Sequence, residues 1–192
     1  QPLVIMDHAL IHRLDRTLDH LEDNLKAVYI KSADQRVFVA GADLKEIDGL
    51  EDDQLLEYLE AGVATFNRLA QLPCQTIALL NGAALGGGLE LALHCSAIIA
   101  TRTNAKGKPY PIGLPEAGLG LCPGWGGTQR MPARMDPTVA IQAAALGQPF
   151  LTNDMPDGLV DVFVDSEEDL VPAADAWCDQ QPDLRHPGSI QD

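Results

Sequence analysis

Short apolar runs alternate with longer amphipathic stretches along most of this 192-residue chain, and this alternation most strongly limits its fold. Apolar runs predict buried strands at 27–30, 37–40, 76–80, 97–100 and 159–164. Apolar residues at helical spacing predict helices at 7–25, 44–47, 52–72, 87–95, 137–146 and 170–177. Strands that alternate with helices favour an α/β architecture in which the strands are largely parallel.

The size and composition of the chain predict a single domain. Hydrophobic residues make up 46% of the sequence and charged residues 21%, which excludes a largely disordered chain. A chain of this length can bury a core without disulfides or metals. We expect one domain over residues 1–192, with a folded core over 1–178 and a polar tail over 179–192.

The net charge of −15 restricts the partners of the protein. A surface this acidic repels phosphate backbones and anionic lipids, so we expect neither a nucleic acid nor a membrane as partner. No apolar run approaches the roughly 20 residues that a membrane span needs. The cysteines form no Cys-x-x-Cys pair, so we expect no metal site, no disulfide framework and a cytoplasmic location.

Two glutamates each follow a glycine-rich turn. Glu90 comes after the glycine run 86–88, and Glu116 comes after Gly113-Leu114-Pro115. Glycine lets a backbone pass close to a ligand because it has no Cβ. Two carboxylates that converge on one small-molecule site could transfer protons by general acid and base catalysis. The alternative is that both glutamates are surface residues and that the glycines only allow tight packing.

The backbone of two turns offers a second component of such a site. Residues 40–43 and 86–88 each lie between a predicted strand and the start of a predicted helix. The first N–H groups of a helix have no partner within the helix. One N–H from each turn could therefore hold the same oxygen atom, with the helix dipoles assisting.

Several common catalytic motifs are absent from the sequence. The glycine-rich segment 121–128 has neither the lysine and spacing of a phosphate loop nor the pattern Gly-x-Gly-x-x-Gly. Nucleotide hydrolysis and dinucleotide binding therefore fit poorly. Without Gly-x-Ser-x-Gly or His-Glu-x-x-His, the commonest serine hydrolase and zinc protease mechanisms are also excluded.

Three segments, in this order, resemble the crotonase family and, more narrowly, its enoyl-CoA hydratases. They are 38–46 (FVAGADLKE), 81–91 (NGAALGGGLEL) and 113–130, which contains GLPE and GGTQR. The resemblance implies a crotonase-like ββα superhelix, in which repeated β-β-α units build stacked sheets flanked by helices. The resemblance also implies that the N- and C-terminal elements of the family are truncated in this sequence, so we expect neither the opening β-hairpin nor the closing helices.

The resemblance also implies roles for individual residues. Ala42 and Gly87 match the two N–H donors of an oxyanion hole that holds the thioester carbonyl of an acyl-CoA. Glu90 matches the residue that orients and activates water, and Glu116 matches the principal acid. The matching substrate-binding positions are Ala40, Asp43, Leu44, Lys45, Gly86 and Gly124.

The activity implied by the resemblance is the addition of water across the 2,3 double bond of a trans-2-enoyl-CoA. It requires no metal and no separate cofactor, because coenzyme A is part of the substrate. Two alternatives remain, namely a double-bond isomerase, which needs one glutamate, and a non-catalytic homologue that binds acyl-CoA.

The resemblance implies a homotrimer or hexamer, as in the family. A larger parent protein is another expectation, because residues 173–187 faintly resemble the stretch after the hydratase part of multifunctional fatty-acid oxidation α-subunits. Fatty-acid β-oxidation is the pathway of such α-subunits, and amino-acid and aromatic degradation, which use such enzymes too, stay open.

Overall fold

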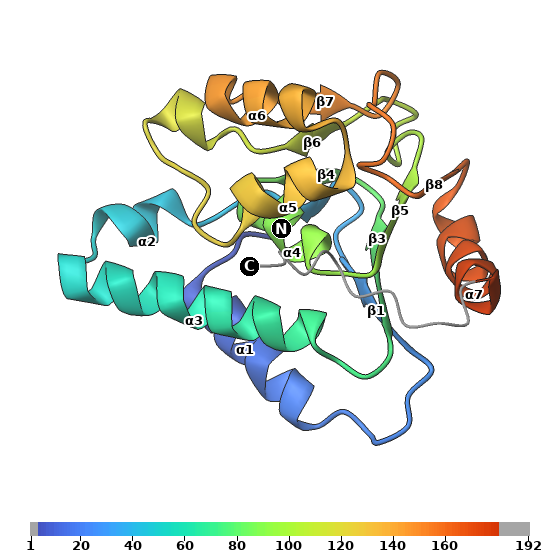
Figure 1. Ribbon diagram of the computed structural model, residues 1–192, viewed down its shortest axis with the longest axis horizontal. Coiled ribbons are helices and arrows are strands. Elements are labelled where there is room, and N and C mark those ends of the chain that lie inside the picture. The colour runs from blue at the N-terminus through green and yellow to red at the C-terminus, as the bar shows by residue number, and fades with distance from the viewer. Residues whose placement is uncertain (1–3, 181–192) are drawn as a thin grey trace.

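A computed structural model of the chain describes residues 4–180 (Figure 1). The strands are β1 (Ala27–Lys31), β2 (Val37–Val39), β3 (Gln75–Leu80), β4 (Ala83–Leu85), β5 (Ala97–Thr101), β6 (Pro111–Gly113), β7 (Phe150–Leu151) and β8 (Val162–Val164). The α-helices are α1 (His8–Asp19), α2 (Leu44–Asp48), α3 (Asp52–Ala70), α4 (Gly87–Leu93), α5 (Gly127–Arg134), α6 (Pro137–Leu146) and α7 (Leu170–Gln180). Two short 3-10 helices are η1 (Glu116–Leu119) and η2 (Glu167–Asp169).

The strands form two four-stranded sheets, ordered β1-β3-β5-β8 and β2-β4-β6-β7. All neighbours are parallel except β6 and β7, which are antiparallel. From β1 to β6, consecutive strands enter different sheets: β1, β3 and β5 belong to the first sheet, and β2, β4 and β6 belong to the second. Each pair is followed by a helix, so the β-β-α repeat expected from the sequence is confirmed.

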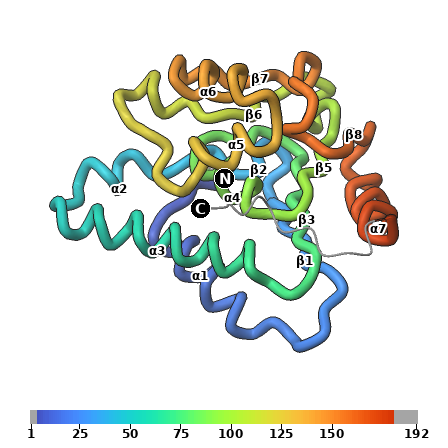
Figure 2. Tube along the Cα trace, in the orientation of Figure 1, coloured from blue at the N-terminus to red at the C-terminus, as the bar shows by residue number. Residues whose placement is uncertain are grey.

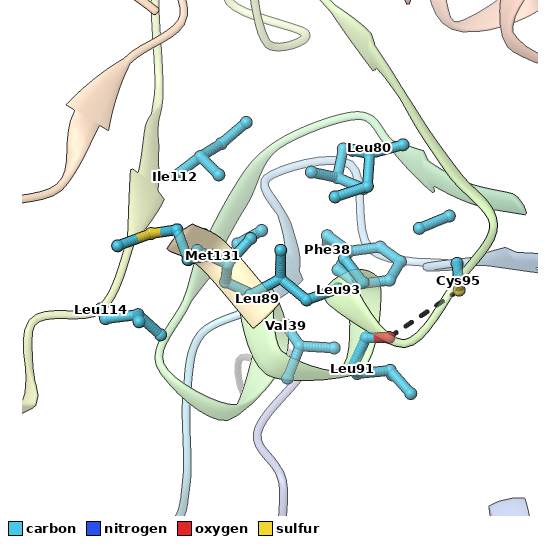
Figure 3. Close-up of a cluster of buried hydrophobic side chains, with 14 of the residues drawn as sticks. Phe38, Val39, Leu80, Leu89, Leu91, Leu93, Cys95, Ile112, Leu114 and Met131 are labelled. Atoms are coloured by element: carbon cyan, nitrogen blue, oxygen red, sulfur yellow. Dashed lines mark hydrogen bonds between the residues drawn. The ribbon is translucent and has the colours of Figure 1, made fainter. Parts of the chain in front are cut away.

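The main core lies where the second sheet, the inner face of the first sheet and α4 meet. Figure 3 shows its centre, where Phe38, Leu80, Leu89, Ile112 and Met131 come together from five elements. These side chains are almost completely buried. Their burial supplies most of the driving force for closing the two sheets over α4.

Strand β3 separates two hydrophobic clusters. Its residues Ala78 and Leu80 belong to the main core, whereas Ile77 and Leu79 point into a second cluster under α7. Successive side chains of a strand face opposite sides, so a strand covered on both faces is apolar throughout. Helix α7 packs against β3 and β5 on this side (Figure 2).

Three predicted helices end earlier than their apolar spacing suggested. The helix predicted at 7–25 ends at Asp19, where the N–H of His20 bonds to the carbonyl of Thr17, and Asn24 has a positive φ of 70°. The helices predicted to end at 72 and 95 end at Ala70 and Leu93. Beyond α3 and α4, Leu72 packs against the main core and Cys95 belongs to it, although both lie outside the helices.

The sequence analysis missed four elements, namely β4, β6, β7 and α5. Three are strands of two or three residues, which become strands only through pairing with neighbours. Helix α5 lies in a glycine-rich segment and contains Pro132. Helix α7 extends two residues past the expected core boundary at 178, and residues 181–192 of the expected tail lie outside the described residues. Within residues 4–180, no helix is both long enough and apolar enough to cross a membrane.

Candidate active site

One pocket brings together both glutamates and both glycine-rich turns. Its walls come from α2, α3, η1, the turns that precede α2 and α4, and the segment 121–125. Ala42, Gly87, Glu90, Glu116 and Trp125 all line it. The rest of the lining is mainly apolar, so a ligand that displaces water from the pocket is surrounded mainly by apolar side chains.

Glu90 is buried at the start of α4, with 1% of its surface exposed. Its Oε1 accepts hydrogen bonds from the backbone N–H groups of Trp125 at 2.7 Å and Gly127 at 2.8 Å. Gly127 allows this approach, because a Cβ there would lie 3.0 Å from Cγ of Glu90. One carboxylate oxygen is therefore fixed by the backbone, which leaves Oε2 for a ligand or a water molecule.

Burial raises the pKa of Glu90 to about 7. The hydrogen bonds from the backbone at Gly127, Trp125 and Gly124 act in the opposite direction, and the nearby charge of Glu116 raises the pKa further. The desolvation of a buried carboxylate outweighs these donors because the charged form loses most of its hydration. Glu90 thus changes its protonation near neutral pH.

Glu116 begins η1 and is partly buried. Its Oε2 is inaccessible to solvent and bonds to none of the described residues. Gly86 lies directly against the carboxyl group, since a Cβ at that position would be 2.7 Å from Oε1. Burial raises the pKa of Glu116 as well, and like charges in one pocket disfavour double ionisation. The charged form of both carboxyl groups at once is therefore unfavourable.

The backbone N–H groups of Ala42 and Gly87 also lie at this pocket. Met6 bridges the turn before α2, with its N–H bonded to the carbonyl of Gly41 and its carbonyl to the N–H of Asp43. This pattern leaves the N–H of Ala42 on the other side of the chain. Neither the Ala42 N–H nor the Gly87 N–H donates to another of the residues 4–180. Two donors from separate turns are therefore available to a ligand.

The six expected substrate-binding residues divide into two groups. Ala40, Leu44, Gly86 and Gly124 line the pocket. Asp43 and Lys45 do not line it. The carboxylate of Asp43 instead caps α2, where it accepts from the N–H groups of Lys45 and Glu46. The Lys45 side chain is exposed.

Sequence reasoning missed two aromatic residues of the pocket. Tyr58 is fully buried and donates its hydroxyl to the carbonyl of Met6 at 2.6 Å. Trp125 packs against Tyr58, with 5.2 Å between the ring centroids. Both residues looked like ordinary core or turn residues in the sequence. A large aromatic residue inside a glycine run was the one available signal for Trp125.

The described part of the chain contains no group of three His, Cys, Asp or Glu residues that could hold a metal ion. The nearest histidine in the sequence to the glutamates, His94, is buried, and its Nδ1 donates to the backbone carbonyl of Glu90 at 2.7 Å. Burial lowers the pKa of His94 to about 4, so its ring is neutral at physiological pH. His94 therefore supports the backbone of α4 in this arrangement.

Comparisons with known proteins agree on one family. The family model described as enoyl-CoA hydratase/isomerase matches residues 5–183. A Bacillus subtilis protein provisionally named enoyl-CoA hydratase/isomerase YngF is 37% identical over 169 residues, which cover 86% of this chain and 62% of that protein. The chain thus spans less than two thirds of the length of this relative.

A solved structure and a longer relative extend the comparison. The crystal structure of an enoyl-CoA hydratase from Bacillus anthracis has a TM-score of 0.81 and 32% identity, covering 92% of this chain and 67% of the other. The fatty acid oxidation complex subunit alpha of Idiomarina loihiensis is 44% identical over 125 residues, which cover 65% of this chain and 16% of that protein.

Proposed function

We propose that this chain, which belongs to the enoyl-CoA hydratase/isomerase (crotonase) family, adds water across the 2,3 double bond of a trans-2-enoyl-CoA. The observation that carries the proposal is the convergence on one pocket of two carboxylates and of two N–H groups that donate to no other described residue. In this proposal coenzyme A belongs to the substrate, and the reaction uses no other cofactor.

The two N–H groups would act on the thioester carbonyl. When water attacks Cβ of an enoyl thioester, negative charge collects on the carbonyl oxygen. Donors from Ala42 and Gly87 aimed at that oxygen would stabilise the enolate, and each such donor typically contributes about 3 kcal/mol in a desolvated site. Binding the carbonyl in this way also places the double bond beside the glutamates.

The two carboxyl groups would divide the proton transfers. Glu90 is held through Oε1 by two backbone N–H groups, so its Oε2 is oriented to accept a proton from water. None of residues 4–180 donates to the buried Oε2 of Glu116, which favours the protonated form of this carboxyl group. The proposal makes Glu90 the base and Glu116 the acid for Cα, and the two backbone donors on Oε1 of Glu90 support this division.

The alternative of double-bond isomerisation is less well supported. Moving a double bond requires one group that removes a proton and returns it at another carbon, so a single carboxylate suffices. Here a second carboxyl group lies in the same pocket and is coupled to the first by its charge. A second carboxyl group of this kind is what water addition needs.

A product analysis would test the proposed reaction. Purified protein would be incubated with crotonyl-CoA, with trans-2-decenoyl-CoA and, separately, with trans-3-hexenoyl-CoA. The proposal predicts that the 2-enoyl substrates lose the absorbance of the unsaturated thioester and gain the mass of one water molecule. Conversion of only the 3-enoyl substrate, without a mass change, would make the protein an isomerase. Binding of all three without turnover would leave an acyl-CoA-binding protein.

A further inference from the structure

The geometry points to Trp125 as a positioning residue, whose ring holds the Gly87 N–H and the Glu90 carboxylate in place for the reaction. The inference rests on the proposed function for its activity assays, but the contacts that carry it are independent of the substrate. Trp125 is buried, with 3% of its surface exposed, and it lines the pocket between α3 and α4.

Two glycines from two helices make room for the Trp125 ring. A Cβ at Gly62, in the middle of α3, would lie 2.3 Å from the indole Nε1. A Cβ at Gly87, the first residue of α4, would lie 2.3 Å from Cζ3 of the same ring. Both distances are far shorter than a carbon atom allows, so both positions require glycine as long as the ring stays where it is.

The helix α3 is built to accept this ring at a cost to its own stability. A glycine inside a helix is less favourable than alanine by about 1 kcal/mol. The indole Nε1 donates to the carbonyl of Leu59 at 3.2 Å, which ties the ring to α3 by a directed bond. Tyr58 and Phe66 on the same helix meet the ring edge-on, at 5.2 and 5.5 Å between centroids. The orientation of the ring is therefore determined on all sides.

The ring connects to both proposed catalytic elements. The backbone N–H of Trp125 and that of Gly127, two residues later, donate to Oε1 of Glu90. The opposite part of the ring lies on Gly87, whose N–H is one of the two unengaged donors. If the ring moves out of the space between Gly62 and Gly87, the segment 125–127 that orients Glu90 can shift. Gly87 then also loses its contact with the ring.

The first test compares the two tryptophans of the chain. Trp177 is a matched control, because it is also buried, at 8% exposed, but packs in the second hydrophobic cluster under α7. We expect Trp125→Phe to lower kcat about tenfold and Trp125→Ala about a hundredfold, since small displacements of catalytic groups have effects of this size. KM should change less than kcat. Trp177→Phe should leave both parameters near the wild-type values while lowering the melting temperature.

The pH profile provides a readout that a loss of stability alone would not change. Burial raises the pKa of Glu90 and the N–H donors lower it, and Trp125→Phe keeps most of the burial. Losing the donors should therefore move the acidic limb of kcat to higher pH in Trp125→Phe. The other titratable groups around Glu90 are Glu116 on η1, Tyr58 on α3 and His94 at the end of α4. None of these is altered by the substitution. An unchanged acidic limb in a folded Trp125→Phe variant would overturn the inference.

A second variant moves the ring without replacing it. Gly62→Ala should stabilise an isolated α3, but its Cβ would collide with the indole. We expect kcat to fall at least about tenfold. The control is Gly49→Ala at the end of α2, where a Cβ would have only ordinary contacts, the nearest at 3.5 Å. A wild-type kcat in Gly62→Ala would show that the position of the Trp125 ring does not affect the reaction.

An optical measurement separates this inference from the proposed reaction. A cinnamoyl-CoA absorbs at longer wavelength when its carbonyl oxygen accepts strong hydrogen bonds, and this shift requires no turnover. We expect the shift on binding to wild type and Trp177→Phe, and a reduced shift in Trp125→Ala and Gly62→Ala. That pattern in a protein without hydratase activity would refute the reaction and retain the positioning role. An equal shift in all four proteins would refute the positioning role.

Discussion

At the scale of single residues, Glu90 shows how burial and hydrogen bonding compete. The two backbone donors on Oε1 favour a charged carboxylate, yet burial prevails and raises the pKa to about 7. A carboxylate with a normal pKa would be a weak base toward water. The same burial that makes Glu90 a stronger base therefore makes its charge unfavourable for folding.

This conflict predicts a pH-dependent gain in stability for Glu90→Gln. A glutamate whose pKa is raised in the folded state favours folding most at low pH, and this contribution is lost as the pH rises through about 7. Glutamine cannot ionise, so the variant avoids that loss. Relative to wild type, its free energy of unfolding should improve between pH 5 and pH 8 by up to about 3 kcal/mol.

Urea unfolding at both pH values measures this difference. Any loss of hydrogen bonding by the amide is the same at both pH values and cancels in the comparison. Gln129→Glu, on the exposed surface of α5, controls for the general effect of one charge. A difference between Glu90→Gln and wild type that stays constant from pH 5 to pH 8 would contradict the raised pKa.

At the scale of elements, Asp43 at the start of α2 has a structural role where a binding role was expected. Asp43 was expected to bind the substrate. In the structure its carboxylate caps α2, and Asp43 is not among the residues that line the pocket. Helix α2 is short and contributes Leu44 and Ile47 to the pocket wall. Asp43 therefore influences the pocket only indirectly, by fixing the position of α2.

We predict that Asp43→Asn is nearly neutral and that Asp43→Ala lowers stability by about 1 kcal/mol, as the loss of an N-cap does. KM for crotonyl-CoA should change less than about twofold in Asp43→Asn, because asparagine also caps a helix and Asp43 does not line the pocket. Thermal unfolding and steady-state kinetics provide the two measurements. A large rise in KM for Asp43→Asn would restore the direct binding role.

The elements also show which parts of the fold are readable from sequence. Helix α3 and strands β3 and β5 carry strong local patterns, and all three were predicted within two residues at each end. Strand β4 has three residues and exists because β2 and β6 pair with it on both sides. Helix α5 begins at a glycine and contains a proline, which are local signals against a helix.

The candidate site follows the same division. Both glutamates and both glycine-rich turns belong to short local motifs, so the sequence was enough to select them. The space for the Trp125 ring depends on Gly62 and Gly87, which lie far from it in the sequence and contact it only after folding. No spacing along the chain could reveal that contact. The role of Asp43 as a cap was equally hidden, because the motif does not show where its carboxylate points.

At the scale of the whole molecule, the net charge of −15 should affect the binding rate of the acyl-CoA substrate that we propose. The phosphate groups of coenzyme A are repelled by such a protein at long range. We predict that kcat/KM for crotonyl-CoA rises about twofold or more when the ionic strength increases from about 10 to 150 mM, because salt screens this repulsion. Crotonyl-pantetheine, which has no phosphate, should show no such rise. Equal salt effects for the two substrates would rule out the electrostatic explanation.

The central claim is that both carboxyl groups act on one enoyl thioester, and Glu116→Gln tests it most directly. Wild type and this variant would be compared for loss of crotonyl-CoA absorbance and for binding of butyryl-CoA, a saturated analogue. The account predicts that wild type hydrates crotonyl-CoA and that the variant is slower by about 10²–10⁴-fold, with butyryl-CoA affinity nearly unchanged. Near-wild-type turnover in Glu116→Gln would remove Glu116 from the reaction and contradict the two-carboxylate mechanism.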